Sequence, residues 1–480
     1  MAAAEIKAAT STQDLHQFLD EYEREHPDEI LHIERPIDAK WEVTALINKL
    51  EKAKRFPVVV CHNLMVDGER SEMPLVTFLL ASRLRLARLL GANVRNVGLM
   101  AYEREQARLK PVTVSRSDAP VKEVVETGGA LDVCKLPAIV HHRMDPGRYI
   151  TAGFFLTYNL ETGADNSAMH RGWLKDRDEI PILLGPASHN RFNFRQYEQA
   201  GKDMPAAFWV GHHPLVEMGA QTRVGPDDSH YETAGGMSGA PLRLVASETL
   251  GNNFLVPADA EVVIEGYVPA GQRRPEGPFG EYTRHVGPQV WGPVLKVTAI
   301  TRRRHAYWDD VMVGHPHWNS LGNEGAIFRA VRQAVPGIKA VHVPMSGAYA
   351  NIYLQIRKTV EGQGKTAAAL ALSSFFQYKH VFVFDDDVDI FDEKEVMQAF
   401  AWRFQGDRDL LVIQGMSGTG LDPSSPDGTT MTKVGFDCTK PVGKPFAERL
   451  AIPDDVMDQI DPSDFVGQER IDRIPLEPWG

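Results

Sequence analysis

Cysteine is scarce in this chain. The 480 residues include three cysteines, Cys61, Cys134 and Cys438, which lie far apart. An odd and sparse set of this kind excludes a disulfide framework and a zinc site built from cysteines. We therefore expect small buried thiols in a reducing compartment, which predicts a cytoplasmic protein.

Positive charge and long apolar runs are also in short supply. The 52 Lys and Arg residues are outnumbered by 64 Asp and Glu, which gives a formal net charge of -12. Nucleic-acid binding needs a positive face for the phosphates, so we expect no nucleic-acid partner. No stretch approaches the roughly 18 apolar residues of a membrane span, and residues 1–15 lack the apolar core of a secretory signal. We therefore expect no membrane partner.

The apolar pattern divides the chain into several parts, as expected at a length for which a single core is improbable. Residues 1–132 alternate helix and strand patterns, which indicates an α/β domain. We expect a helix capped by Ser11 and Thr12, helices over 41–52 and 74–90, and a buried strand over 57–61.

The texture changes at about residue 133. From there to residue 322, short β-rich runs lie between clusters of Gly, Pro, Asn and Asp, which predicts a closed or nearly closed β-barrel. Residues 323–480 return to alternating helices and strands and predict a second α/β domain. The runs are 149–159, 242–246, 260–268 and 294–301 in the barrel, and 326–334, 340–344, 366–378, 380–384 and 393–404 in the last domain.

Glu276 and Glu281 lie in the most informative local segment, Pro-Glu-Gly-Pro-Phe-Gly-Glu. Two glycines and a proline between the carboxylates exclude a regular helix and force a tight turn. In such a pair one carboxyl can stay ionised while the pKa of its neighbour rises, which suits proton transfer. An exposed hairpin tip with two solvated acids is the alternative, and for this segment alone it is the more frequent situation.

Candidate metal ligands and an anion-binding arginine fall in three other segments. Asn166 and Arg171 follow a predicted strand and could hold a metal and an anionic carboxylate respectively. His189 adds an imidazole. If the chain near His230 is extended, His230 and Glu232 point to the same side, so either could reach a site. These donors suit Mn²⁺ or Mg²⁺, although each residue alone is more often part of an ordinary turn or loop.

In this order and spacing, the segments resemble the UbiD family of prenylated-FMN-dependent decarboxylases, over about residues 30 to 450. The residues Glu276-Gly-Pro-Phe-Gly-Glu281 match the acidic loop of that family letter for letter. The other matching segments are the stretch 137–151 that enters the central domain, the run 382–392 followed by Trp402 and Arg403, and the stretch Lys433-Val-Gly-Phe-Asp-Cys-Thr439.

The resemblance implies an α+β protein of three domains. These are an N-terminal α/β domain over 1–132, a central flavin-reductase-like split β-barrel that binds prenylated FMN over 133–322, and a C-terminal α/β domain over 323–480. The last domain is implied to mediate oligomerisation, so we expect a homodimer or a larger homo-oligomer.

The resemblance also implies site residues. Arg171 would hold the substrate carboxylate and the adduct, Glu281 would deliver the proton that replaces CO₂, and Glu276 would sustain the hydrogen-bond network with Arg171. The metal that clamps the cofactor phosphate, Mn²⁺ or Mg²⁺ with K⁺ as a further candidate, would bind Asn166, His189 and a third ligand. Position favours His230 as that ligand, where the family usually has Glu, and Glu232 is the alternative. The implied cofactor-binding residues are Asn166, Ser167, Met169, His170, Arg171, Ser188, His189 and Lys433.

The implied reaction is a reversible, non-oxidative decarboxylation through a covalent adduct with prenylated FMN, which a flavin prenyltransferase would supply. The substrate would be an aromatic, heteroaromatic or α,β-unsaturated carboxylic acid. His315, His317 and Trp318 favour an aromatic or bulky acid, unless their segment is a hinge without substrate contact. A conventional flavin oxidoreductase and a non-catalytic subunit or maturation factor are the alternatives.

Overall fold

The computed structural model describes residues 14–185, 188–318, 321–425 and 429–474. The chain forms two compact units, Met1–Thr439 and Lys440–Gly480. The predicted cap residues Ser11 and Thr12 lie outside the described residues. The helix α1 (Leu15–Glu25) is capped by Asp14, whose side chain accepts hydrogen bonds from the backbone of His16 and Gln17.

The N-terminal part is a four-stranded sheet with helices. The sheet has the order β1 (Ile30–Ile33), β3 (Val58–Cys61), β6 (Leu75–Thr77) and β23 (Trp308–Asp310), so a later strand completes it. The helices are α1, α2 (Glu42–Lys52), α3 (Arg83–Leu89) and α4 (Val97–Gln106).

The helix predicted over 74–90 is wrong in its first half. Residues Leu75–Thr77 form β6, which is buried on both faces between β3 and β23. The helix α3 begins only after Ser82, whose side chain accepts a hydrogen bond from the backbone of Arg85. A fully buried strand and a buried helix turn have the same apolar pattern, so periodicity could not separate them.

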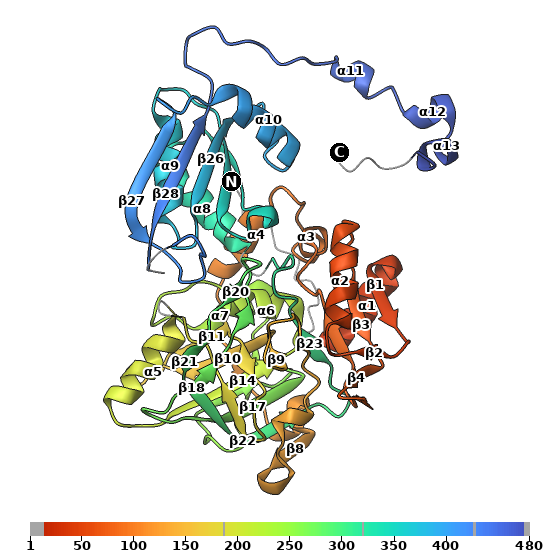
Figure 1. Cartoon of the computed structure of the whole chain (residues 1–480), viewed down its shortest axis with the longest axis vertical. Helices are drawn as coiled ribbons and strands as arrows, with labels where there is room; N and C mark the ends of the chain where they lie inside the picture. Colours follow the sequence, from red (N-terminus) through yellow and green to blue (C-terminus); the bar gives the residue numbers. More distant parts are fainter. Residues whose placement is uncertain (1–13, 186–187, 319–320, 426–428, 475–480) are drawn as a thin grey trace. The chain divides into compact units, whose positions relative to one another are not determined.

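The central part is a seven-stranded antiparallel sheet, whose strands are drawn in yellow and green in Figure 1 except for one in orange. Its two faces carry separate cores, because alternate residues of one strand point to opposite sides. Phe155 and Phe208 lie in one core, whereas Phe154 and Trp209 stack at 4.0 Å in the other. The path is β11 (Asp165–Met169), β10 (Gly153–Tyr158), β14 (Met204–Val210), β17 (Val262–Val268), β22 (Val294–Arg302) and β13 (Glu179–Pro181), with β8 (Val124–Thr127) also paired to β22.

Three helices accompany this sheet, and two of them begin at predicted site residues. The helices are α5 (His189–Gln199), α6 (Pro214–Ala220) and α7 (His230–Ser238). Ser188 caps α5 and Ser229 caps α7, each through a side-chain oxygen that accepts a backbone N–H. The N-terminal ends of both helices carry a partial positive charge, beside His189 in α5 and His230 in α7. In α7 the buried Asp165 carboxylate already accepts the backbone N–H of Tyr231 at 3.0 Å.

The C-terminal part contains a five-stranded sheet, in blue in Figure 1. Its order is β24 (Ile338–His342), β25 (Asn351–Ile356), β26 (His380–Asp385), β28 (Thr430–Cys438) and β27 (Leu410–Ser417). It packs with α8 (Gly322–Ala334), α9 (Gln363–Ser373) and α10 (Glu393–Arg403). The predicted α+β class is confirmed.

The second unit, Lys440–Gly480, contains the short helices α11 (Asp454–Met457), α12 (Pro462–Val466) and α13 (Gln468–Asp472). These described helices bury none of their residues. Among the helices that the structure describes, none is long and apolar enough to cross a membrane.

Candidate active site

Arg171 lies between the two glutamates that the sequence singled out. It stands between β11 and β12 (Gly172–Trp173), whereas Glu276 ends β18 (Arg274–Glu276) and Glu281 follows β19 (Phe279–Gly280). Arg171 Nε donates to Glu276 Oε1 and Nη2 donates to Oε2, each at 2.8 Å, which is a bidentate pair. Its third nitrogen, Nη1, donates to Glu281 Oε1. The structure thus brings together all three predicted catalytic residues.

Burial distinguishes the two carboxyl groups. Glu276 is fully buried, and 11% of the Glu281 side chain is exposed. Burial raises the pKa of Glu281 to about 7, against the opposing influence of Arg171. Burial acts to lower the pKa of Arg171, but the hydrogen bond to Glu276 and the charges of Glu281 and Glu276 together outweigh it, and the pKa is raised. The site therefore pairs a permanent cation with an acid that can keep its proton near neutral pH.

Glycines make room for these side chains. Gly277 has φ of 81°, and a Cβ there would lie 3.0 Å from Pro288 O and 3.3 Å from Arg171 Nη2. A Cβ on Gly287 would lie 2.7 Å from Glu281 Oε1. The tight turn predicted from the sequence is confirmed. The alternative of an exposed hairpin tip is wrong, since both acids point inward to Arg171.

The predicted metal ligands Asn166, His189 and His230 gather at one side of the barrel sheet. Asn166 Nδ2 donates to the side chain of Asn190, next to His189, at 2.6 Å. Burial is the main cause that lowers the pKa of His230, which is 5% exposed, and the charge of His189 lowers it further. His230 Nδ1 has no hydrogen-bond partner among the described residues. Burial lowers the pKa of His230 to about 4, so it is a neutral donor.

Glu232 faces elsewhere, and the expectation that it shares a side with His230 is wrong. The segment is the first turn of α7, so residues two apart point about 200° apart around the axis. The Glu232 carboxylate instead acts on Arg108. Within the described ranges, no group of three or more His, Cys, Asp or Glu is arranged to hold a metal ion. The predicted set, an amide with two imidazoles, is of a different composition.

The other predicted cofactor residues make structural contacts around this cluster. Ser167 Oγ accepts from Trp209 Nε1 at 3.1 Å, and the backbone of Met169 donates to the side chain of Gln221. Ser188 caps α5. The His170 ring bonds Leu183 O through Nδ1 at 2.9 Å, while its Nε2 has no partner in the part of the chain that the structure describes. Burial lowers the pKa of His170 to about 4.

Lys433 reaches toward the same region from β28. Its Nζ donates to Leu372 O at 2.8 Å and to Phe375 O at 2.7 Å, and burial lowers its pKa to about 8. The Phe375 ring lies 4.5 Å from the guanidinium of Arg223, whose charge also lowers the pKa of His189 after the larger contribution of burial. Sequence reasoning missed Arg223, because no local pattern places it beside His189.

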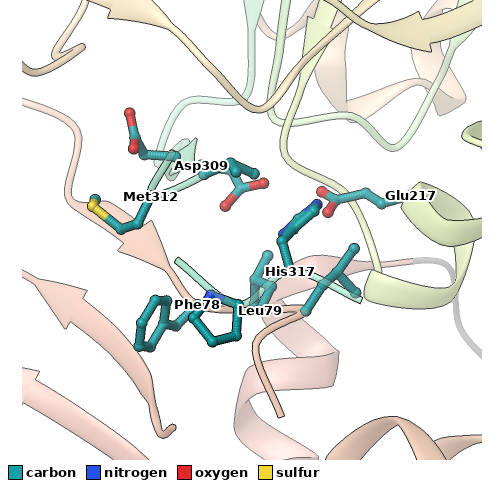
Figure 2. A pocket seen from close by; sticks show the side chains of 10 residues that line it. Phe78, Leu79, Glu217, Asp309, Met312 and His317 are labelled. Carbon is teal, nitrogen blue, oxygen red and sulfur yellow. The ribbon is translucent and has the colours of Figure 1, made fainter. Parts of the chain in front are cut away.

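A small cavity of about 10 Å³ lies between residues 78–80 and residues 309–317. Figure 2 shows the ring of His317 beside the Glu217 carboxylate. Burial raises the pKa of Glu217 well above its usual range and that of Asp309 to about 8, whereas it lowers that of His317 to about 4. Three neutral groups therefore line a space for about one water.

His315 and Trp318, on either side of His317, form hydrogen bonds with the N-terminal part of the chain. His315 Nδ1 is bonded to Glu51, and the backbone of Trp318 donates to Leu80 O at 2.8 Å. The predicted contact of this segment with substrate stays a prediction.

Comparisons with known proteins agree with this geometry. Three family models match in order: the 3-octaprenyl-4-hydroxybenzoate carboxy-lyase N-terminal domain over residues 22–99, the Rift-related domain over 112–316 and the C-terminal domain over 319–438. The chain belongs to the UbiD family. As a UbiD-family protein, it is an enzyme of the carboxy-lyase class.

Relatives and solved structures extend the match over almost the whole chain. An anhydromevalonate phosphate decarboxylase of Methanosarcina mazei is 31% identical over 89% of this chain and 96% of its own length. A gallate decarboxylase of Lactiplantibacillus plantarum is 29% identical over 82% of this chain and 84% of its own. The UbiD-class enzyme HmfF from Pelotomaculum thermopropionicum, in complex with FMN, has a TM-score of 0.87 and 32% identity, and covers 94% of this chain and 99% of its own. A second HmfF structure, an evolved dimeric form in complex with prFMN, has a TM-score of 0.83 and 30% identity.

Proposed function

We propose that this protein catalyses the reversible, non-oxidative decarboxylation of an aromatic, heteroaromatic or α,β-unsaturated carboxylic acid with prenylated FMN as its cofactor. The observation that carries the proposal is the Arg171 guanidinium held between buried Glu276 and the near-neutral acid Glu281. The decarboxylase names of the relatives and the FMN and prFMN of the HmfF structures support the same reaction class.

The residues present fit the cofactor and its metal. His230 Nδ1 and His170 Nε2 are buried nitrogens without a described partner, and α5 begins at His189. Helix N-termini favour a phosphate, and neutral imidazoles with an amide oxygen can hold a divalent cation between protein and phosphate. Asn166, His189 and His230 would hold the metal, with Lys433 nearby. When bound, the prenylated flavin supplies an electron sink for the charge left by loss of CO₂.

The chain itself supplies orientation and a proton. Arg171 can bind the substrate carboxylate with a fixed fork of N–H donors, while Glu276 keeps that fork in place. Glu281 accepts from the same guanidinium through Oε1 and can hold a proton on its other oxygen near neutral pH, so it can deliver that proton to the carbon that has lost CO₂.

Production with and without a flavin prenyltransferase tests the proposal. We expect CO₂ release from at least one member of a panel of aryl and enoic acids only after co-production with the prenyltransferase, together with a changed visible spectrum. Hydride transfer with ordinary FMN would instead identify a conventional flavin oxidoreductase. No CO₂ release from the loaded protein, with gain of activity on adding a partner subunit, would identify a non-catalytic or maturation role.

The third metal ligand is tested separately. We expect His230→Ala to lose Mn²⁺ in a chelation and readdition titration and Glu232→Ala to retain it, since residues two apart in the first turn of α7 point to different sides of the helix. Loss of the metal only from the Glu232 variant would overturn this assignment. We also propose a homo-oligomer, which light scattering of the purified protein checks.

A further inference from the structure

Two hydrogen bonds, which we call ties, link the turn that carries the two glutamates to the segment 145–149. Tyr149 opens β9 (Tyr149–Ile150), is fully buried, and accepts a hydrogen bond on its Oη from the backbone N–H of Gly277 at 3.2 Å. Its ring also stacks on Phe279 at 4.0 Å, and the Arg171 guanidinium lies 5.2 Å from that same Phe279 ring. Tyr149 therefore touches the turn through its hydroxyl and supports the arginine through a ring stack.

Asp145 makes the second tie. Its Oδ1 accepts from the backbone N–H of Gly280 at 3.3 Å, and its Oδ2 accepts from the backbone N–H of His142 at 2.6 Å. The Asp145 side chain is fully buried. A Cβ on Gly280 would lie 2.6 Å from the His142 ring, so the turn already approaches this segment as closely as a glycine permits.

Each tie stands next to a different glutamate. Gly277 directly follows Glu276, and Gly280 directly precedes Glu281. We propose that Tyr149 and Asp145 are positioning residues for the proposed decarboxylation, in which Tyr149 sets the place of Glu276 on Arg171 and Asp145 sets the place of Glu281. The inference rests on the proposed function for its kinetic consequences, whereas the two ties themselves do not depend on it.

The two residues act on different glutamates because each hydrogen bond fixes the backbone next to one of them. Fixing the backbone restricts the position of the Cβ of that glutamate, and small displacements at a reacting centre can cost about a hundredfold in rate. Burial raises the pKa of the Tyr149 hydroxyl, so it stays neutral and accepts the N–H without adding a charge beside Glu276. Asp145 has one oxygen for each of its two N–H partners, so an amide side chain could satisfy only one of them.

Hydrogen exchange on the full-length protein tests the ties without any catalytic assay. The two variants are Tyr149→Phe, which keeps the ring stack, and Asp145→Asn. The control is Tyr22→Phe, which removes the hydroxyl of another buried tyrosine, on α1. We expect at least about tenfold faster exchange at the Gly277 amide in Tyr149→Phe and at the Gly280 amide in Asp145→Asn, with no change there in the control. Unchanged exchange at both glycines would overturn the inference.

Kinetics of the enzyme loaded with prenylated FMN test the consequence. We expect Tyr149→Phe to lower kcat/KM about tenfold with an unchanged apparent pKa, and Asp145→Asn to move the apparent pKa of the rate profile, because only Asp145 is tied beside Glu281. Equal kinetic losses in all three variants, the control included, would contradict separate positioning. If the exchange results hold and even the wild-type enzyme releases no CO₂ from any acid, then the proposed function fails and the ties remain.

Discussion

Replacing Glu281 by glutamine removes an acid whose pKa burial raises to about 7 and leaves a side chain of nearly the same size. Glutamine can still accept a hydrogen bond from Arg171 through its carbonyl oxygen, but it has no proton to give. A positioned general acid contributes about 10²- to 10⁴-fold to a rate. We therefore expect kcat of Glu281→Gln to fall by about a thousandfold for the best substrate, with a much smaller change in KM.

The same variant has a second effect, on stability. A carboxyl whose pKa is higher in the folded than in the unfolded protein stabilises the fold fully below its unfolded value, and this contribution is lost as pH rises through the folded value. For Glu281 the values are the ordinary 4.5 and about 7. Between pH 5 and pH 8 the wild type should therefore lose about 2–3 kcal/mol of unfolding free energy through this group.

Urea unfolding at pH 5 and at pH 8 measures this loss. Other titrating groups are shared by wild type and variant, so the difference between the two proteins isolates Glu281. We expect Glu281→Gln to gain about 2–3 kcal/mol relative to wild type on going from pH 5 to pH 8. A difference that does not vary with pH would falsify the raised pKa, and a kcat within threefold of wild type would refute its role as proton donor.

Two other predictions concern the guanidinium and the buried acid pair. Arg171→Lys should lower kcat/KM about a hundredfold in steady-state assays, because an ammonium lacks the fork that bonds both oxygens of Glu276 and one of Glu281. A tenfold loss or less would show that a positive charge alone is sufficient. Asp309→Asn should resist alkaline unfolding better than wild type, since the raised pKa of about 8 means that the wild type loses this contribution as pH rises through 8. Melting temperatures at pH 7 and pH 9.5 check this, with Glu217→Gln as the companion variant, and parallel losses in all three proteins would contradict it.

The sequence indicated that Glu276 and Glu281 lie close together because their geometry is local. A turn with two glycines and a proline permits few backbone conformations, and the spacing of Glu276 and Glu281 follows from it. Arg171 was a candidate for anion binding from its own segment, but its pairing with the two glutamates was implied only by the resemblance, since 105 residues separate Arg171 from Glu276. The burial of Glu276 and Glu281 could not be predicted from the local sequence either, since the segment alone favoured an exposed hairpin tip.

A sequence signal could have shown that the chain at His230 and Glu232 is helical and not extended. Ser229 and Glu232 have the Ser-x-x-Glu spacing of a capping box, which marks the start of a helix rather than an extended strand. In the structure Ser229 Oγ accepts from the backbone of Glu232 at 3.2 Å. Tyr149 and Arg223 had no comparable signal, because their roles depend on contacts with Gly277 and His189 that only the folded chain creates.

The chemistry of the site depends on an asymmetry between two identical side chains. Glu276 receives two donors from Arg171 and is fully buried, whereas Glu281 receives one and keeps a small exposed fraction. Arg171 thus holds both oxygens of Glu276 and one oxygen of Glu281, and burial raises the pKa of Glu281 to about 7. Gly277 and Gly287 preserve this arrangement, because a Cβ on Gly277 would lie 3.3 Å from Arg171 Nη2 and a Cβ on Gly287 would lie 2.7 Å from Glu281 Oε1.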